Sequence, residues 1–359
     1  MTAVANWQIN NFKKVKHHPL DWTNAALYIG MMSWAKMADT CKYLDWLYHI
    51  GQKYHWQPYF RMYHADDFAV TQMYLDMSRL KQENDIIIPT QARLDWVINH
   101  PATSSLDFRQ FNKHTLDRWS WCDALFMAPP VYIKMFKITG DTNYIRFMDK
   151  EYKATYNYLY DKEEHLFYRD SRYFDKQEAN GEKVFWGRGN GWVMAGLVTI
   201  LKELPANSEY RRFYETLFKE MAAKTASLQD KNGYWHASLL DSKSYPNPET
   251  SASGFLCYAL AYGINSGLLN QKQYMPTVKK AWTALTEAVY PEGKLGWVQP
   301  IGADPKKVTK DMTEVYGVGA FLLAGTEIYK LAIRSDDNAI IIQAKNPLTI
   351  SRDNEVLTL

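Results

Sequence analysis

The fold is decided by a stretch that reads NPETSASGFLCYALAYG and covers residues 247–263. It opens with polar residues and continues into small and apolar ones, so a helix formed here can pack closely on every side. Five other stretches open in a similar way: DWTNAALYIGM at residues 21–31, YHADDFAVTQMY at 63–74, WSWCDALFMAPP at 119–130, FWGRGNGWVMAGL at 185–197 and KDMTEVYGVGAFLLAG at 310–325. Six segments of one kind indicate an internal repeat of inner helices.

More charged and amphipathic segments alternate with these six, such as YIRFMDKEYKATYNYLY at residues 144–160. The pattern predicts twelve helices, at residues 3–15, 22–38, 40–56, 65–82, 88–99, 118–138, 141–160, 189–204, 207–229, 250–268, 271–289 and 312–332. Their alternation predicts an all-α fold, an (α/α)6 barrel of six inner and six outer helices in one domain, residues 1–335. Residues 336–359 are rich in β-branched residues and interrupted by proline, so we expect a C-terminal tail that forms short strands or stays irregular.

Charge, cysteine content and hydropathy exclude several classes of protein. Lys and Arg number 42 against 39 Asp and Glu, without a basic stripe, so a nucleic-acid partner is not expected. The three cysteines lie far apart and no CxxC or HExxH occurs, so neither a metal site nor a disulfide framework is indicated. The longest uncharged run contains polar residues and glycines, and predicts a buried helix rather than a membrane span. The N-terminus lacks an apolar stretch of signal-peptide type, which leaves a cytoplasmic or a periplasmic location open.

The predicted barrel has a consequence for ligand binding. If the inner helices are parallel, their six N-termini meet at one mouth and create a site that favours an anionic ligand. The chain also has 13 Trp and 25 Tyr, and aromatic rings of this kind either fill a core or cover the faces of sugars. The residues at the predicted helix starts are Asp66, Asp67, Asp123, Arg188, Glu249, Asp311, Glu314, Trp22, Trp121, Trp186 and Trp192.

Four stretches carry candidate site residues. In WGRGNGW, at residues 186–192, Arg188 can clamp a carboxylate and Trp192 can stack on a sugar, or the string is a tight loop whose arginine pairs with a structural acid. In HADD, at residues 64–67, two carboxylates follow His64, and a helix cap accounts for one of them. Asp123 lies in an apolar stretch that should raise its pKa, which suits a general acid, although a buried and hydrogen-bonded Asp is equally compatible. Arg169 precedes Asp170 in LFYRDSRYF, at residues 166–174, and can line the same cleft.

Together with PETSASGFLCYALAYGI, these strings resemble glycoside hydrolase family 105, the unsaturated rhamnogalacturonyl hydrolases, which are related to the unsaturated glucuronyl hydrolases of family 88. The resemblance extends from about residue 21 to residue 330. It implies an (α/α)6 barrel and an oligosaccharide substrate that ends in a Δ4,5-unsaturated uronic acid, as polysaccharide lyases leave behind on pectin or rhamnogalacturonan. It implies no metal and no organic cofactor.

The resemblance also implies roles for individual residues. Asp123 takes the place of the general acid, and Asp66 or Asp67 takes the place of a second active-site carboxylate. Arg188 and Trp192 match the substrate-binding Arg and Trp, with His64, Trp22, Trp121 and Trp186 beside them. Some members have a His where this chain has Arg169. In this family the acid protonates C4, water adds at C5, and the resulting hemiketal opens and expels the aglycone. The rule that relates the separation of the two carboxylates to the stereochemistry of glycoside hydrolysis therefore does not apply.

Two other functions fit the same barrel. One is a polysaccharide lyase or a sugar epimerase, because tyrosines able to act as bases are abundant. The other is a non-catalytic glycan-binding protein that uses the aromatic mouth, although such a protein has little need of a desolvated acid at its centre. The oligomeric state and the aglycone are not predicted by the sequence.

Overall fold

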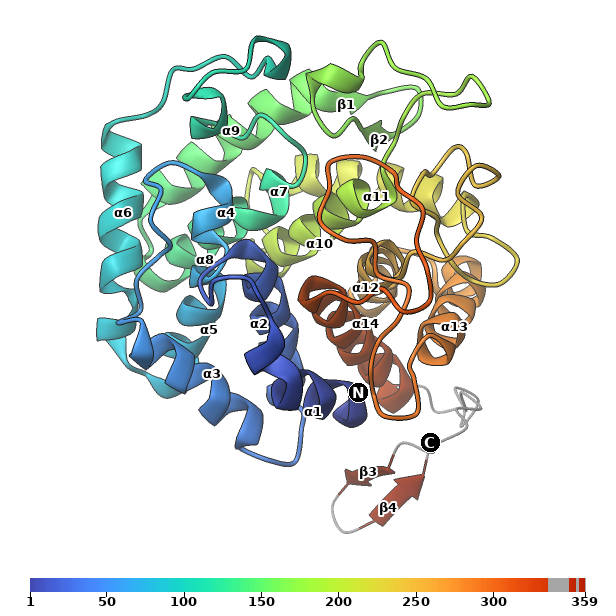
Figure 1. The fold of residues 1–359 in the computed structure, drawn as a ribbon. Coiled ribbons are helices and arrows are strands. Elements are labelled where there is room, and N and C mark those ends of the chain that lie inside the picture. Colours follow the sequence, from blue (N-terminus) through green and yellow to red (C-terminus); the bar gives the residue numbers. More distant parts are fainter. Residues whose placement is uncertain (335–348, 353–354, 359) are drawn as a thin grey trace.

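Six largely buried helices form a closed inner ring in the computed structural model, which describes residues 1–334, 349–352 and 355–358. Each inner helix contacts the next, and the last contacts the first (Figure 1). The inner helices are α2 (Trp22–Ala35), α5 (Thr71–Lys81), α8 (Pro129–Thr139), α10 (Gly187–Glu203), α12 (Thr250–Asn265) and α14 (Val315–Arg334).

Six further helices alternate with the inner ones along the chain and cover them from outside. These outer helices are α1 (Thr2–Asn11), α3 (Lys42–Lys53), α6 (Ile88–Asn99), α9 (Thr142–Leu159), α11 (Arg211–Ser227) and α13 (Gln271–Glu287). The predicted (α/α)6 barrel is therefore confirmed. Short 3₁₀ turns lie in the connections, at Phe12–Lys14, Asn84–Ile87, Phe108–Gln110, Thr115–Asp117 and Ser171–Tyr173.

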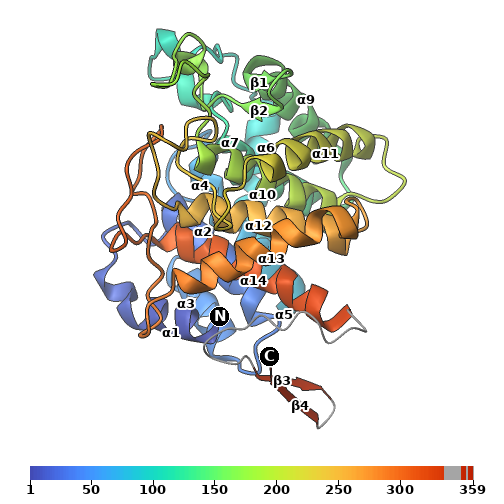
Figure 2. The same cartoon turned by 90° about the vertical axis from the view of Figure 1, so that its right-hand side faces the viewer.

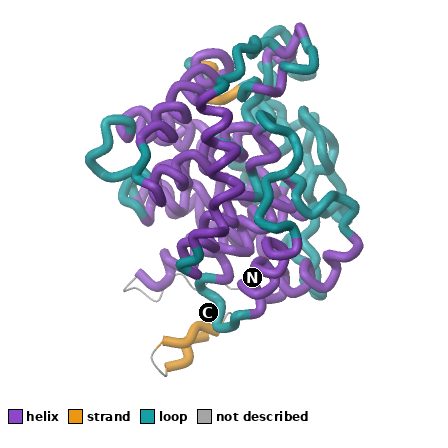
Figure 3. Tube along the Cα trace, turned by 90° about the vertical axis from the view of Figure 1, so that its left-hand side faces the viewer, coloured by secondary structure: helices purple, strands orange, loops and turns teal. Residues whose placement is uncertain are grey.

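Small residues show that the inner helices run parallel. A Cβ on Gly319, in the second turn of α14, would lie 2.2 Å from the carbonyl oxygen of Ala26, in the second turn of α2. Gly254 of α12 approaches Ala320 of α14 in the same way. Because like turns face each other, the N-termini of these helices lie at one end of the barrel. Figures 2 and 3 show the long loops gathered at this end, which we call the mouth.

Two predicted helices are each interrupted near the mouth. The segment predicted at 65–82 consists of a short helix, α4 (Ala65–Phe68), followed by α5. The segment predicted at 118–138 contains α7 (Ala124–Met127) and then α8, whose first two residues are prolines. Proline lacks a backbone N–H and has a fixed φ, so it begins a helix more easily than it continues one. These breaks place Asp66 in one short helix at the mouth and Asp123 immediately before the other.

Two antiparallel strand pairs complete the described part of the chain. Strands β1 (Tyr160–Asp161) and β2 (Leu166–Phe167) form a hairpin that the sequence did not predict. It directs the chain after α9 towards the mouth, where residues 168–174 follow. In the C-terminal tail, β3 (Thr349–Arg352) pairs with β4 (Glu355–Thr358). Part of the tail expected at 336–359 lies outside the described residues.

Candidate functional site

Asp66 is a partly exposed carboxylate with a high proton affinity. It lies in α4, and its side chain is 17% exposed. Burial raises the pKa of Asp66 from its usual value to about 8; Arg61 opposes this increase, and the negative charges of Asp123 and Asp67 add to it. At neutral pH this group is therefore protonated and able to donate a proton.

Asp67 has a different environment from its neighbour. Its side chain is fully buried and accepts three hydrogen bonds from Arg61, from the backbone N–H at 2.7 Å and from Nε and Nη2 at 3.0 and 2.6 Å. Both carboxylate oxygens are thus occupied by one arginine. The two carboxylates that the sequence left as alternatives are separated by their contacts, and Asp66 is the one without such a pairing.

His64 begins α4 and lies beside Asp66. Its Nδ1 accepts a hydrogen bond from the backbone N–H of Asp66 at 3.3 Å, and its ring is 5.0 Å from the ring of Trp121. Burial lowers the pKa of His64 to about 3, and the positive charges of Arg61 and Arg169 contribute. His64 is therefore a neutral hydrogen-bonding group, and both it and Trp121 are largely buried.

Asp123 immediately precedes α7 and faces two arginines. Burial raises the pKa of Asp123, while Arg169 and Arg188 act in the opposite direction. Nε of Arg169 lies 3.4 Å from Oδ2 of Asp123. The Sγ of Cys122 donates to the same carboxylate at 3.6 Å. The structure thus places Asp123 in the desolvated environment that its apolar sequence neighbours predicted.

Both terminal nitrogens of Arg188 are hydrogen-bonded within the protein. Its side chain is fully buried, and Nη1 and Nη2 donate to the carbonyl oxygens of Gln299 and Pro300 at 2.6 and 3.0 Å. The guanidinium lies between the rings of Trp186 and Tyr316, at 4.4 and 4.7 Å. The prediction that Arg188 clamps a substrate carboxylate is therefore not supported in this structure, because both terminal nitrogens already bind backbone carbonyls.

Gln299 lies in a loop segment, residues 298–304, that we call the strap. Its backbone N–H donates to Oε1 of Glu249 at 3.0 Å, and its side-chain oxygen accepts from Nε1 of Trp186 at 3.2 Å. Glu249 also caps α12 through the N–H groups of Ser251 and Ala252. Arg188, Trp186 and Glu249 thus fix the strap across the starts of α10 and α12.

The two predicted stacking tryptophans have different positions. Trp192 is fully buried, with ring centroids 4.6 Å from Phe126 and 4.3 Å from Phe255, so it has no face open to a sugar. Trp22 is partly exposed and stacks on Tyr316 at 5.4 Å. Trp192, the fourth residue after Arg188, points into the barrel core, so its predicted stacking on a sugar stays a prediction that this burial does not support. Trp22 is the aromatic residue available at the mouth.

The remaining residues of the predicted mouth are dispersed. Glu314 lies at the start of α14, 3.2 Å from Nε2 of His17. Asp311 instead accepts a hydrogen bond from exposed Tyr290 at 2.6 Å and is not part of the carboxylate group. Sequence reasoning missed Arg61, Gln299 and Tyr316, which come from loops or from a helix position without a motif. Asp170, by contrast, is adjacent to Arg169 in a string that the sequence singled out.

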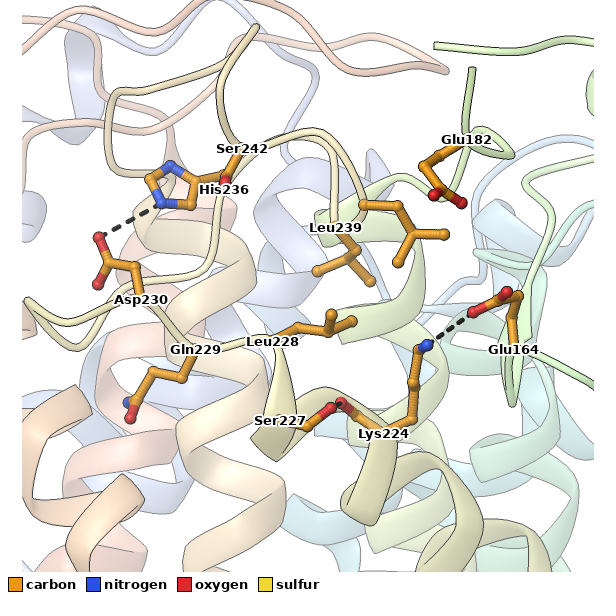
Figure 4. Close-up of a pocket in the computed structure, with 11 residues that line it drawn as sticks. Glu164, Glu182, Lys224, Ser227, Leu228, Gln229, Asp230, His236, Leu239 and Ser242 are labelled. Atoms are coloured by element: carbon orange, nitrogen blue, oxygen red, sulfur yellow. Dashed lines mark hydrogen bonds and ion pairs between the residues drawn. The ribbon is translucent and has the colours of Figure 1, made fainter. Parts of the chain in front are cut away.

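A separate cavity of about 490 Å³ lies beside the end of α11, and no residue of the Asp66–Asp123 site lines it. Figure 4 shows Nε2 of His236 directed at Asp230, at 3.3 Å, and Lys224 paired with Glu164 at 2.6 Å. Its charged side chains are thus largely paired with one another. Within the described residues, no cluster of His, Cys, Asp and Glu is arranged to hold a metal ion, and no helix is long and apolar enough to cross a membrane.

Comparisons with known proteins bear on the family and the fold of the chain. A model of Glycosyl Hydrolase Family 88 matches residues 1–332. The unsaturated 3S-rhamnoglycuronyl hydrolase of Formosa agariphila is 42% identical over 323 residues, which are 87% of this chain and 85% of that protein. The solved structure of a family 88 glycosyl hydrolase from Bacteroides vulgatus superposes with a TM-score of 0.81 at 31% identity, covering 91% of this chain and 97% of that one. A structure described as a polysaccharide lyase gives a TM-score of 0.83 at 32% identity, covering 93% and 96%.

Proposed function

This chain belongs to glycosyl hydrolase family 88, and from that membership we propose that it removes a terminal Δ4,5-unsaturated uronic acid from lyase-generated oligosaccharides. The resemblance to family 105 that the sequence motifs suggested leads to the same substrate class. A relative with 42% identity is named an unsaturated 3S-rhamnoglycuronyl hydrolase, which supports the choice of an unsaturated uronate as the terminal sugar. The observation that carries the proposal is the pair of desolvated carboxylates, Asp66 and Asp123, at the mouth.

The chemistry begins with a proton transfer to carbon. The C4=C5 bond of the substrate is an enol ether, so protonation at C4 leaves positive charge on C5 and the ring oxygen. Asp123 donates this proton, since burial keeps its carboxyl group protonated to higher pH than an exposed aspartate. Its conjugate base then lies beside the developing positive charge and stabilises it.

The second step adds water at C5. The Asp123 carboxylate formed in the first step accepts a proton from this water while protonated Asp66 orients it by a hydrogen bond, and the resulting hemiketal opens to a ketone at C5. The hemiacetal left at C1 then releases the aglycone as an alcohol. No metal or organic cofactor enters this scheme, and every proton has a carboxylate or water as its donor or acceptor.

Substrate binding uses the partly exposed groups of the site. Trp22 covers one face of the terminal sugar. Arg169, whose side chain is 16% exposed, receives the uronate carboxylate in place of Arg188. Trp192 meets the ring of Trp22 edge-on at 6.0 Å, and Arg188 lies over Tyr316, on which Trp22 stacks. Trp186 packs against Arg188, and Trp121 against His64.

The direction of an absorbance change tests the proposal. A hydrolase of this type removes the conjugated double bond, whereas a lyase creates it. We expect ultraviolet absorbance to fall when the enzyme is mixed with a panel of lyase-generated disaccharides that differ in the aglycone. An increase in absorbance on intact polyuronide, with no loss on any disaccharide, would favour the lyase function of the structurally similar protein.

A further inference from the structure

Arg169 lies between two carboxylates and is held closely by only one of them. Its Nη1 donates to Oδ2 of Asp170 at 2.6 Å, whereas its Nε is 3.4 Å from Oδ2 of Asp123. Nε is buried and makes no hydrogen bond within the described part of the chain. The guanidinium is therefore engaged by Asp170 and only loosely paired with Asp123.

Asp170 is itself shared between two arginines. It is fully buried and accepts hydrogen bonds from the backbone N–H of Arg172 at 3.0 Å and from Nε and Nη2 of Arg172, each at 2.9 Å. Both guanidinium groups also lie over the ring of Phe108, at 5.3 Å for Arg169 and 4.5 Å for Arg172. The charged side chains therefore contact one another in the order Asp123, Arg169, Asp170, Arg172.

Other charges also face Asp123. Arg188 approaches from α10, Asp66 from α4 and the thiol of Cys122 from the preceding residue. Arg188 is fixed by the strap carbonyls, and Asp66 lies in a short helix. The trio of Arg169, Asp170 and Arg172 is thus the group of charges beside Asp123 whose members pair with one another, and it keeps one net positive charge.

We propose that Asp170 is a positioning residue for the acid: by holding Arg169, it prevents a close Arg169–Asp123 ion pair and so lets Asp123 hold its proton to higher pH. The inference rests on the proposed function, in which Asp123 is the proton donor. A full ion pair would favour the ionised carboxylate, because an opposite charge at contact distance stabilises the charged form. The acid would then ionise at lower pH even though every substrate-contacting group remained in place.

The net charge of the trio in each variant predicts the direction in which the ionisation of Asp123 shifts. Arg169, Asp170 and Arg172 together carry one positive charge. The Asp170→Asn variant carries two, so Asp123 should ionise at lower pH. Arg172→Gln and Arg169→Gln each leave the trio neutral, so Asp123 should ionise at higher pH. The general acid must be protonated, so its ionisation sets the basic limb of the profile of kcat/KM against pH.

The experiment measures that profile for the wild type and the three variants on one unsaturated disaccharide. We expect the basic limb to move down by about one pH unit in Asp170→Asn and up in Arg172→Gln, in the range of shifts that one neighbouring charge produces. Arg169→Gln should also move the limb up, with a higher KM because it contacts the substrate. If Asp170→Asn does not fold, the two arginine variants still test the direction in which the basic limb moves.

Asp107→Asn is the matched control. Asp107 accepts a hydrogen bond from Oγ of Ser171 at 2.8 Å and pairs with Arg109, so it supports the same turn without touching Arg169. It should lower thermal stability without moving the limb. An unmoved limb in Asp170→Asn, or a limb moved downwards in Arg172→Gln, would overturn the inference.

The proposed function fails in a different way. If Asp123→Asn retains near-normal turnover, Asp123 is not the acid and the assignment of the limb is lost. If Asp123→Asn is inactive but the other variants leave the limb in place, only the role of Asp170 is refuted.

Discussion

At the scale of single residues, adjacent carboxylates with the same chemistry have different roles because their contacts differ. The side chain of Asp67 is closed off by three hydrogen bonds from Arg61, whereas that of Asp66 is partly exposed and carries a raised pKa. No sequence pattern distinguishes two consecutive aspartates in one short helix. The assignment depends on Arg61, which lies in a loop before the motif and whose orientation follows from the fold.

The raised pKa of Asp66 predicts a pH-dependent cost in stability. Between about pH 4 and pH 8 the folded chain binds a proton at Asp66 that the unfolded chain has released, so the free energy of unfolding falls as the pH rises through this window. Asn cannot ionise, so Asp66→Asn should be more stable than the wild type at pH 9, by on the order of 1–3 kcal/mol, and nearly equal at pH 4. Thermal unfolding at both pH values measures the difference.

Asp67→Asn is the natural comparison for that experiment. It removes the charged partner of Arg61 and should lower the free energy of unfolding at pH 7 by about 1–3 kcal/mol, because the hydrogen bonds it leaves are weaker. If Asp66→Asn is the less stable of the two variants at pH 9, the Asp66 and Asp67 carboxylates do not differ in environment as described.

At the scale of elements, the strap shows what the WGRGNGW motif does. Gly187 lets the start of α10 approach the chain at His236, because a Cβ there would lie 2.3 Å from the carbonyl oxygen of His236. Arg188 then reaches the strap rather than solvent. The sequence left open the alternative that Arg188 is structural, with an acid as its partner, whereas the structure gives it two backbone carbonyls. Its partners, two carbonyls more than 100 positions away, have no sequence signal.

Arg188→Lys tests this role. A single ammonium cannot reproduce the planar fork that binds the carbonyls of Gln299 and Pro300, so the strap should loosen. We expect a lower melting temperature and a lower kcat/KM. Esterification of the substrate carboxylate should reduce kcat/KM by similar factors in the wild type and in Arg188→Lys, because Arg188 does not contact that group. A much smaller effect in the variant would restore Arg188 as the uronate clamp.

Close packing of inner helices makes a second prediction at this scale. Gly319→Ala would place a methyl group 2.2 Å from the carbonyl oxygen of Ala26, so α14 and α2 must separate. Overpacking of this kind costs about 1–3 kcal/mol. Gly302→Ala is the control, since its nearest neighbour would be 3.4 Å away and no large change is expected. Chemical denaturation should distinguish the two, and equal stabilities would contradict the tight crossing.

At the scale of the whole molecule, the repeat of small-residue helix starts was sufficient to predict the barrel. Six similar segments that alternate with amphipathic ones can bury their faces only by closing into a double ring, and the contacts of α14 with α2 close it. The repeat pattern did not predict where inner helices break: Pro129 and Pro130 account for the interruption at residue 128, whereas no proline or glycine marks the one at residues 69–70. Asp123 was predicted from its apolar neighbours, whereas the burial of Trp192 depends on Phe126 and Phe255, which come from two other helices.

The most direct test of the account records two signals in one reaction: the loss of the substrate double bond, by ultraviolet absorbance, and the release of the aglycone, by chromatography. For the wild type we predict one double bond lost for each aglycone released. Asp123→Asn should slow both by about 10²-fold or more while its circular dichroism stays unchanged, because general acid catalysis is removed. Near-normal rates in a folded Asp123→Asn variant, or aglycone release by the wild type with the double bond retained, would contradict the account.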